Sequence, residues 1–449
     1  MKNIDSNMKL PPGPWKLPII GNLHQLVKFG SLPHQILRDL ANQHGPLMHL
    51  QLGELSTVVV SSAQMAKEVL ITHGVVFAGR PYVAAIDAVT YGSRDISMAP
   101  YGNYWRHVRK ICTVELLTAK RVQSYESIRQ EEVSALVKSV SSNQRSPVNL
   151  SKQIFSLTYR ITSRAAFGYT SDGHESYSEV VEKLTKLGSG FGLADMYPSF
   201  RMLEHISGMK QKVEALFQQS DRILQGIIDE HRTRLETGKT GEEEEAKEDL
   251  VTALLKIQQL GGLEFPLADQ EIKAIVLDIF AGGGESSSTT VEWAMSEMVR
   301  NPRVLKKAQY EVRQICHEKG DVDEASIKEL KYLALVIKET LRLHPPFPLL
   351  LPRESRENCE VNGYQVPLKT KVIINAWAIG RDPKYWSEAE TFHPERFSNN
   401  SIDFKGTDLN FIPFGAGRRV CPGISFALPN VELPLAKLLF HLIGNFRMK

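Results

Sequence analysis

The stretch PFGAGRRVCPG, residues 413–423, decides how this chain folds and what it can hold. It places Cys421 on a short glycine-rich loop, with Phe414 seven residues before the cysteine, Arg419 two before it and Gly423 two after it. Glycine has no Cβ, so the backbone of such a loop can approach a flat object closely. A thiolate here is suited to one strong bond to a metal, and haem iron takes a ligand of this kind.

The alternative interpretation of Cys421 is a small buried hydrophobic residue, which is the usual role of a lone cysteine. The surrounding pattern favours a ligand instead, because the positive charge of Arg418 and Arg419 favours the thiolate. A zinc site would need further cysteine or histidine residues at close spacing. The other cysteines are scattered singly, at Cys112, Cys316 and Cys359. The pattern therefore favours a haem-type ligand over zinc.

The composition is that of a globular enzyme with a large core, since 42% of the 449 residues are hydrophobic and 23% are charged. The formal net charge of +3 is too small to indicate binding to nucleic acid. Four cysteines without a pairing pattern fit a reducing compartment. No apolar run reaches the roughly 18 residues that a membrane-spanning helix needs.

Hydrophobic periodicity predicts a mainly helical α+β chain with small sheets and no repeated βαβ units. The expected elements are strand, turn, strand and helix over 47–70, helices over 103–141, 208–236, 269–301 and 326–344, a solvated loop over 241–249 and a hairpin at Asn362-Gly363. The helix over 269–301 would be about 48 Å long, with Asp269 as its cap and Pro302 as its stop.

The chain divides into a polar tail over 1–10, a proline-rich hinge over 11–22 and one domain over 23–449. Four prolines make the hinge, PPGPWKLPIIGN, semi-rigid and non-helical. It is typical of a surface entry segment, or of a segment that follows a membrane anchor.

The long helix contains AGGGESSSTT at 281–290. Three consecutive glycines cost on the order of 3 kcal/mol relative to alanine, so something should require them. One interpretation is a local opening of the hydrogen-bond ladder against a flat cofactor, where Glu285 and Ser286 could relay protons to bound dioxygen. The other is a kink that permits close helix packing. A cysteine-ligated metal elsewhere favours the first.

Two weaker motifs combine charge with helical spacing. Glu339 and Arg342 form E-x-x-R on one helix face, and Arg396 in FHPERF is a candidate third member of a buried ion-pair network. Trp105 and Arg109 form W-x-x-x-R, where an indole N–H and a guanidinium could hold a carboxylate. Standing alone, the first is an ordinary surface pair and the second an amphipathic helix with a snorkelling arginine.

Taken in order, these motifs make the chain resemble a cytochrome P-450, a haem-thiolate monooxygenase, and within that family the plant microsomal group that begins PPGPW. The resemblance covers nearly the whole chain. It implies the cytochrome P-450 fold, with haem b between a long oxygen-binding helix and the cysteine loop. It also implies oxygen insertion into a small lipophilic metabolite, with a terpenoid favoured, and electrons from NADPH-cytochrome P-450 reductase.

The resemblance also assigns roles to residues. Cys421 would ligate the iron, and Trp105, Arg109, Arg353 and Arg419 would hold the haem propionates, with Phe414 and Gly423 also against the cofactor. Glu285 and Ser286 would serve oxygen activation, and Glu339, Arg342 and Arg396 would be structural. Apolar substrate contacts would come from three segments: Ile96 and Met98; Ile279, Phe280 and Gly282; and Phe347, Leu349 and Leu350.

Partners and location follow from the same resemblance. Arg106, His107, Lys110 and Arg418 would meet an acidic reductase surface. The protein would be a monomer at the cytosolic face of the endoplasmic reticulum membrane, although the family's N-terminal anchor is missing from this chain.

Three features depart from the family pattern: serine replaces threonine at Ser286, the anchor is missing, and the chain stops at HLIGNFRMK (441–449) without the further β-hairpin. Serine is freer at χ1 than threonine, so uncoupling is a hazard. Two alternatives therefore stay open: a haem-thiolate isomerase or dehydratase, and an inactive truncated haem-binding protein.

Overall fold

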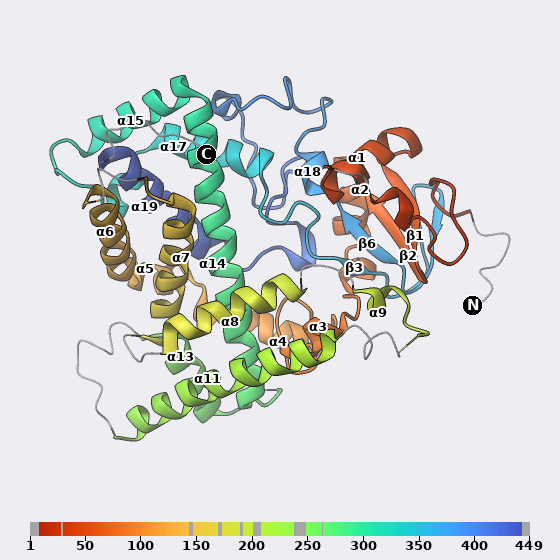
Figure 1. The fold of residues 1–449 in the computed structure, drawn as a ribbon, viewed down its shortest axis with the longest axis horizontal. Coiled ribbons are helices and arrows are strands. Elements are labelled where there is room, and N and C mark those ends of the chain that lie inside the picture. The colour runs from red at the N-terminus through yellow and green to blue at the C-terminus, as the bar shows by residue number, and fades with distance from the viewer. Residues whose placement is uncertain are drawn as a thin grey trace.

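The computed structural model describes residues 9–27, 30–142, 147–168, 173–188, 192–200, 208–237, 248–262 and 264–441 (Figure 1). The long helix α14 (Asp269–Arg300) runs through a region of packed helices, and a smaller region built on a four-stranded sheet lies beside it. The predicted mainly helical class with small sheets is confirmed. Most of the predicted solvated loop over 241–249 lies outside the described residues.

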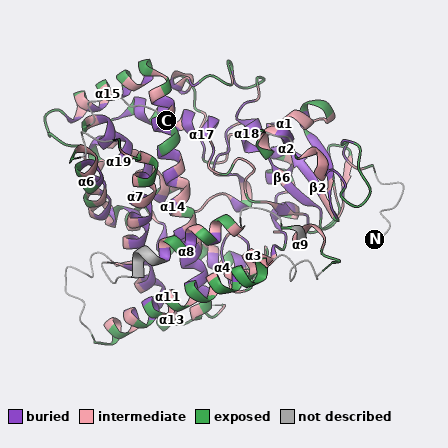
Figure 2. Cartoon of the chain, viewed as in Figure 1, coloured by how far each residue is buried: buried purple, intermediate pink, exposed green. Residues whose placement is uncertain are grey.

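The main sheet has the order β1-β2-β6-β3, from β1 (Leu47–Leu52), β2 (Leu55–Val60), β6 (Lys371–Ile374) and β3 (Arg353–Glu354). β1 and β2 form the predicted hairpin over the Gly53-Glu54 turn, where Gly53 has a φ of 62°. β2 pairs with β6 in parallel, which joins segments more than 300 residues apart in the sequence. Figure 2 shows β2 and β6 as largely buried strands.

The second hairpin joins β4 (Cys359–Val361) to β5 (Tyr364–Val366). Its turn residues Asn362 and Gly363 both have positive φ, 51° and 78°, as a type I′ turn requires. The predicted Asn-Gly hairpin is therefore confirmed. The predicted helix after β2 is also present, as α2 (Ala63–Lys67) and the π-helical turn η2 (Glu68–Thr72), with the Ser62 hydroxyl accepting the N–H of Met65.

The second half of α14 is one member of a four-helix bundle. The other members are α6 (Glu126–Ser142), α7 (Leu150–Phe167) and α19 (Ile424–His441). α7 runs antiparallel to α14, because the Ser151 hydroxyl bonds Glu292 near one end while Thr162 faces Gly283 near the other. α6 and α19 run parallel, since Tyr125, just before α6, packs on Phe426 and Ser134 bonds Lys437.

Two predicted helices are broken in the structure, which corrects the prediction at both places. The span 103–141 divides into α4 (Asn103–Ile111), the π-helical turn η4 (Cys112–Leu116), α5 (Ala119–Ser124) and α6. The span 326–344 divides into α16 (Glu324–Ile327) and α17 (Lys331–Leu343). A new cap explains two of the restarts, those of α5 and α17. The Thr118 hydroxyl accepts the N–H of Arg121, and the Glu311 carboxylate accepts the N–H groups of Tyr332 and Leu333.

Helix α14 has nearly the predicted bounds, but Asp269 is not its cap. Ala268 occupies the cap position, and its N–H donates to the carboxylate of Glu271. The Asp269 carboxylate instead pairs with Arg232 of α11 (Met209–Thr237). The predicted stop is confirmed, because Pro302 begins the next helix, α15 (Pro302–Cys316).

The remaining elements are short or peripheral. They are η1 (Leu23–Gln25), α1 (Pro33–His44), η3 (Val76–Ala78), α3 (Ala84–Val89), α8 (Gly173–Gly188), α9 (Leu193–Met196), α13 (Leu250–Leu260), α18 (Ala376–Ile379), η5 (Pro394–Phe397) and η6 (Gly417–Arg419). Within the described parts of the chain, no helix combines the length and apolar character that crossing a bilayer requires.

Candidate haem site

The cysteine loop is a tight structure that precedes α19. The N–H of Cys421 donates to the carbonyl of Phe414 at 3.0 Å, and the N–H of Gly423 points at the Cys421 sulfur at 3.4 Å. Gly417 has a φ of 68°, and a Cβ there would lie 2.1 Å from the carbonyl oxygen of Leu70. Glycine at 417 is therefore explained by contact with η2, and does not need the flat cofactor that the sequence led us to expect.

The charge beside the Cys421 sulfur also differs from the expectation. Burial raises the pKa of the thiol, while the N–H of Gly423 and the guanidinium of Arg109 act in the opposite direction. Arg418 is exposed on the outer side of the loop, and Arg419 is occupied by backbone carbonyls. The cation that favours the thiolate is therefore Arg109 on α4, rather than the two arginines of the loop.

Three further arginines, Arg80, Arg109 and Arg353, lie near Arg419 of the cysteine loop. Among the described residues, none of Arg80, Arg109, Arg353 and Arg419 has a carboxylate within ion-pair distance. Arg419 donates to the carbonyls of Ala78 and Ala99, at 2.9 and 2.7 Å. Burial lowers the pKa of Arg419 to about 8, that of Arg353 to about 9 and that of Arg80 to about 10. Repulsion from neighbouring arginines adds to the lowering at Arg419 and Arg353, whereas the carboxylates of Asp95 and Asp278 oppose it at Arg80.

The cluster carries an excess of positive charge, because its four guanidinium groups are opposed by the carboxylates of Asp95 and Asp278, which form no ion pair with them. Burying charge without a counter-charge is costly, and guanidinium groups bind carboxylates in a fixed orientation. The two propionates of haem would supply the missing negative charge, and Cys421 would supply the ligand. The residues present therefore fit haem, and Arg80 joins the three arginines that the sequence predicted.

Trp105 is buried on α4, and its indole N–H donates to the carbonyl of Ile96 at 2.9 Å. The Arg419 guanidinium lies 4.4 Å from the centre of the indole ring. The structure thus gives Trp105 a role in placing Arg419. A direct contact between Trp105 and a propionate stays a prediction.

The glycines of α14 serve helix packing. A Cβ on Gly284 would lie 3.0 Å from ring atoms of Tyr159, and one on Gly283 would lie 3.0 Å from the ring of Phe426. The helix continues without a break through both positions. The structure therefore supports the close-packing interpretation for Gly283 and Gly284. Only Gly282 is exposed, with no atom within 4 Å of its Cβ position, as an approaching cofactor or substrate would need.

The two predicted proton-relay residues, Glu285 and Ser286, come directly after the three glycines of α14. The Ser286 hydroxyl donates to the carbonyl of Gly282 at 2.5 Å, so it lies on the open side of α14. Burial and the nearby carboxylate of Glu182 on α8 raise the pKa of Glu285. A raised pKa favours the protonated form of this carboxyl, as a proton donor needs. The role of Glu285 and Ser286 in proton delivery stays a prediction.

The predicted substrate residues divide into three groups. Ile96, Met98 and Ile279 are buried, and Ile96 and Ile279 share one apolar cluster. Phe280 is fully buried, and its ring centre lies 5.6, 5.6 and 4.9 Å from those of Tyr159, Phe167 and Tyr177, so the structure gives it a packing role. Leu349 and Leu350 pack on clusters around the sheet, and Phe347 is 45% exposed.

The E-x-x-R residues and Arg396 lie together in the core. Glu339 receives two hydrogen bonds of 2.8 Å from Arg342 and one of 2.9 Å from Arg396. Arg342 also donates to the carbonyls of Gly380 and Ala389. Both members of the Glu339–Arg342 pair are fully buried. The network ties α17 to the segment that leads into the cysteine loop.

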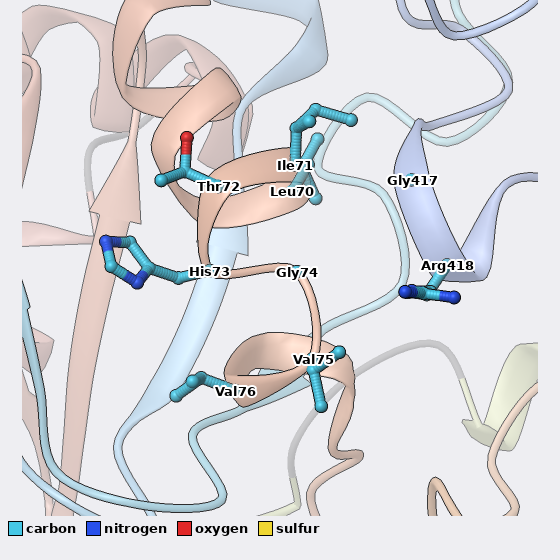
Figure 3. A pocket seen from close by; sticks show the side chains of 9 residues that line it. All are labelled: Leu70, Ile71, Thr72, His73, Gly74, Val75, Val76, Gly417 and Arg418. Atoms are coloured by element: carbon cyan, nitrogen blue, oxygen red, sulfur yellow. The ribbon is translucent and has the colours of Figure 1, made fainter.

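A surface pocket of about 460 Å³ lies on the outer side of the cysteine loop (Figure 3). Residues 70–76 line one side of it, and Gly417 and Arg418 line the other. Cys421, Arg419 and Gly282 are not among its lining residues, so this pocket is separate from the candidate haem site.

Sequence reasoning missed three members of the site: Arg80, Asp95 and Asp278. Arg80 donates to the carbonyls of Ser97, Leu351 and Pro352, and the two aspartates bind the backbone between Ile96 and Met98. Arg80 and Asp278 contact residues far from them in the sequence, so no local signal could have found them. Asp95 contacts Ser97 and Met98, two and three residues further on, and this short-range pattern is a signal that the sequence analysis did not use.

The site combines a cysteine sulfur beside a backbone N–H, four arginines with no ion-paired carboxylate among the described residues, and one exposed glycine, Gly282, on a continuous helix. This combination fits a haem-thiolate protein. The comparisons identify which one. The cytochrome P450 family model matches residues 11–449. The chain therefore belongs to the cytochrome P450 family, and it is a monooxygenase with haem b as its cofactor.

Its relatives are plant enzymes. Cytochrome P450 71D10 from Glycine max is 54% identical over 441 residues, which cover 97% of this chain and 85% of that relative. Premnaspirodiene oxygenase from Hyoscyamus muticus is 52% identical, covering 98% and 87%, and tabersonine 16-hydroxylase 1 from Catharanthus roseus is 52% identical, covering 96% and 85%. Among solved structures, a zebra fish cytochrome P450 with progesterone has a TM-score of 0.78 at 26% identity, over 91% of this chain and 92% of that one.

Proposed function

We propose that this protein inserts one oxygen atom of dioxygen into a small lipophilic plant metabolite, with a terpenoid as the favoured class. NADPH would supply two electrons through a reductase. The balanced reaction converts substrate R–H, dioxygen, NADPH and a proton into R–OH, water and NADP⁺. The haem, when bound, supplies the oxygen chemistry, and the chain orients the substrate and delivers protons.

One observation carries the substrate class. The open Gly282 lies on the same helix as buried Ile279, and Ile279 shares an apolar cluster with Ile96. A substrate site bordered by these apolar side chains would favour a hydrocarbon scaffold over a charged or sugar-like substrate. Relatives named premnaspirodiene oxygenase and tabersonine 16-hydroxylase are both 52% identical to this chain, so alkaloids are tested beside the favoured terpenoids.

The substrate proposal is tested with purified protein, a plant NADPH-cytochrome P-450 reductase, and panels of terpenoids and alkaloids under ¹⁸O₂. A product heavier by one ¹⁸O atom supports the proposal. A product without the label indicates the isomerase or dehydratase alternative. NADPH consumption that yields only hydrogen peroxide indicates uncoupling, and would overturn the proposed activity for that panel.

We propose that the reductase docks at the outer side of the cysteine loop. Arg106, Lys110 and Arg418 are exposed there, whereas the Nε2 atom of His107 is buried, which makes His107 a poor contact. Ile71 and Val75 add exposed apolar surface at the pocket in Figure 3. Charge complementarity mainly increases the association rate.

Charge reversal tests this docking surface. Lys110→Glu and Arg418→Glu should each raise the reductase concentration needed for half-maximal turnover, and the effect should shrink at high salt. Exposed Lys384, on the surface after α18, offers the matched control Lys384→Glu. Equal behaviour of all three variants would contradict the proposal.

We also propose that one face of the protein meets a membrane surface. Trp15, Ile19 and Phe200 are 67%, 82% and 62% exposed. Their two segments meet at the β1–β2 turn, where the N–H of Gly53 donates to Ile20 and the N–H of Glu54 donates to Met196. Exposed aromatic and aliphatic side chains of this kind favour the bilayer interface.

Co-sedimentation with phospholipid vesicles tests the membrane face. Ile19→Glu and Phe200→Glu should reduce the bound fraction. Leu260→Glu, at an exposed leucine elsewhere on the surface, should not. Wild-type binding by the first two variants would contradict the proposal. Sedimentation equilibrium at micromolar concentration tests the proposed monomer.

A further inference from the structure

The loop between Asp95 and Met98 is held by two carboxylates. One oxygen of Asp278, on α14, accepts the N–H groups of Ile96 and Ser97, both at 2.8 Å. Asp95 accepts the N–H of Met98 at 3.1 Å and the hydroxyl of Ser97. Every backbone N–H from 96 to 98 therefore ends on a carboxylate oxygen.

The carbonyls of the same loop face the arginine cluster. The Ile96 carbonyl accepts the indole N–H of Trp105 at 2.9 Å and a guanidinium N–H of Arg419 at 3.3 Å. The Ser97 carbonyl accepts from Arg80 at 2.7 Å. The loop is thus fixed between α14 on its N–H side and the residues proposed to hold haem on its carbonyl side.

Arg80 extends this connection to a second segment. It donates to the carbonyls of Leu351 and Pro352 at 2.9 and 2.7 Å. These residues directly follow Leu350, which belongs to another of the apolar segments proposed to contact substrate. One arginine therefore sets the distance between two walls of the proposed substrate site.

We propose that Asp278 is a positioning residue that sets both haem retention and the shape of the substrate pocket. It does so by fixing the 95–98 loop, and with it the Ile96 carbonyl that orients Trp105 and Arg419. This inference rests on the proposed function, since it takes Ile96 and Met98 as substrate contacts. The essential property of Asp278 is an oxygen acceptor at the right place, because hydrogen bonds to the two N–H groups are what it supplies.

Two substitutions separate these properties. Asp278→Asn keeps an oxygen acceptor, whereas Asp278→Leu has a similar volume and keeps none. Asp269→Leu is the matched control, because Asp269 lies on the same helix but pairs with Arg232, away from the loop. Arg80→Gln weakens the same loop from its other side.

Two readouts report on positioning, and neither depends on turnover. The first is the rate of haem transfer to apomyoglobin. The second is the ratio of the dissociation constants of imidazole and of clotrimazole, a bulky triaryl imidazole, from optical difference spectra. A change in this ratio reports pocket shape, whereas a loss of overall stability would not alter it in folded, haem-loaded protein.

We expect Asp278→Leu to release haem at least about tenfold faster and to change the ratio about tenfold, as the loss of two buried hydrogen bonds implies. Asp278→Asn and Asp269→Leu should stay close to wild type. Wild-type values for Asp278→Leu would overturn the proposal. If Asp278→Leu does not fold, Arg80→Gln must show both the faster haem release and the changed ratio. Wild-type values for Arg80→Gln would then overturn the proposal. Absence of terpenoid turnover would leave both readouts measurable, so the two failures are distinguishable.

Discussion

Gly284 of α14 lies so close to Tyr159 of α7 that a Cβ on the glycine would sit 3.0 Å from two atoms of the tyrosine ring. Ordinary carbon contacts are longer, so a Cβ at 284 would require the buried Tyr159 ring to shift by a few tenths of an ångström. The spacing of these helices therefore depends on a residue with no side chain.

Gly284→Ala should lower the free energy of unfolding by about 1–2 kcal/mol, because overpacking outweighs the gain in helix propensity. Gly226→Ala is the control, since Gly226 lies within α11 and has nothing within 4 Å of its Cβ position. That variant should be stabilised by up to about 1 kcal/mol. Urea unfolding measures both, and equal effects would contradict the packing explanation.

Glu339→Gln should be strongly destabilising. It leaves two buried guanidinium groups, those of Arg342 and Arg396, without their carboxylate. Breaking a buried pair costs roughly 3–5 kcal/mol.

Glu395→Gln provides the comparison for Glu339. Glu395 pairs with Arg303 and Lys307, which are both largely exposed, so its loss should cost about 1 kcal/mol or less. Urea unfolding followed by circular dichroism measures the difference. A cost for Glu339→Gln as small as that for Glu395→Gln would contradict a structural network.

Some residues of the haem site and of the buried ion-pair network could be predicted from the sequence and others could not, for a physical reason. Cys421, Gly423 and Phe414 stand in one loop, and Glu339 and Arg342 share one helical turn, so local spacing reveals them. Arg80 and Asp278 reach the 95–98 loop only after it and α14 have packed, and nothing in their own neighbourhoods marks them. Asp95 caps its own loop locally, but its place beside Asp278 depends on the same packing. The sequence alone favours a cofactor surface for the glycines of α14. The residues against which Gly283 and Gly284 pack, Phe426 and Tyr159, lie over a hundred residues away in the chain, so the packing role is not visible there.

The breaks within two predicted helices were missed for a similar reason. The restart of the helix at Lys331 depends on the carboxylate of Glu311, which caps it from a different helix. Hydrophobic periodicity continues through residues 328–330 and does not register this cap. By contrast, the Asn362-Gly363 turn and the Pro302 boundary depend only on local backbone preferences, and both predictions were right.

Haem carboxylates should be essential to binding. Reconstitution of the haem-free protein with protohaem dimethyl ester, which lacks both carboxylates, should give a dissociation rate at least about tenfold above that of haem, as lost charge-assisted hydrogen bonds imply. Arg109→Gln should reduce this difference, because one of the partners is already removed. Arg303→Gln, at a surface ion pair, should not. Equal dissociation rates for haem and its ester would contradict the role of the arginine cluster.

The buried aspartates predict a pH dependence. Burial, together with the neighbouring Asp95 carboxylate, raises the pKa of Asp278 to about 7 from its usual 3.8. Between these values the folded chain holds a proton that the unfolded chain has released. Stability from this group is therefore present at low pH and falls as pH rises to 7, by at most about 1.4 kcal/mol per pH unit.

Urea unfolding across this pH range, compared between wild type and Asp278→Asn, measures the effect. The substitution should flatten the fall in stability. Asp269→Asn should not, because Arg232 lowers the pKa of Asp269 and its contribution lies at lower pH. Parallel pH profiles for wild type and Asp278→Asn would contradict the assignment.

The central claim is that the Cys421 sulfur ligates haem iron, and the carbon monoxide difference spectrum of the reduced protein tests it most directly. Thiolate ligation shifts the Soret band to long wavelength. We predict this band for wild type and for Cys359→Ser, a substitution at a partly exposed cysteine away from the site. Cys421→His should bind haem but lose the band. A haem-loaded, folded wild-type protein without the thiolate band, or a Cys421→His variant that retains it, would contradict the account.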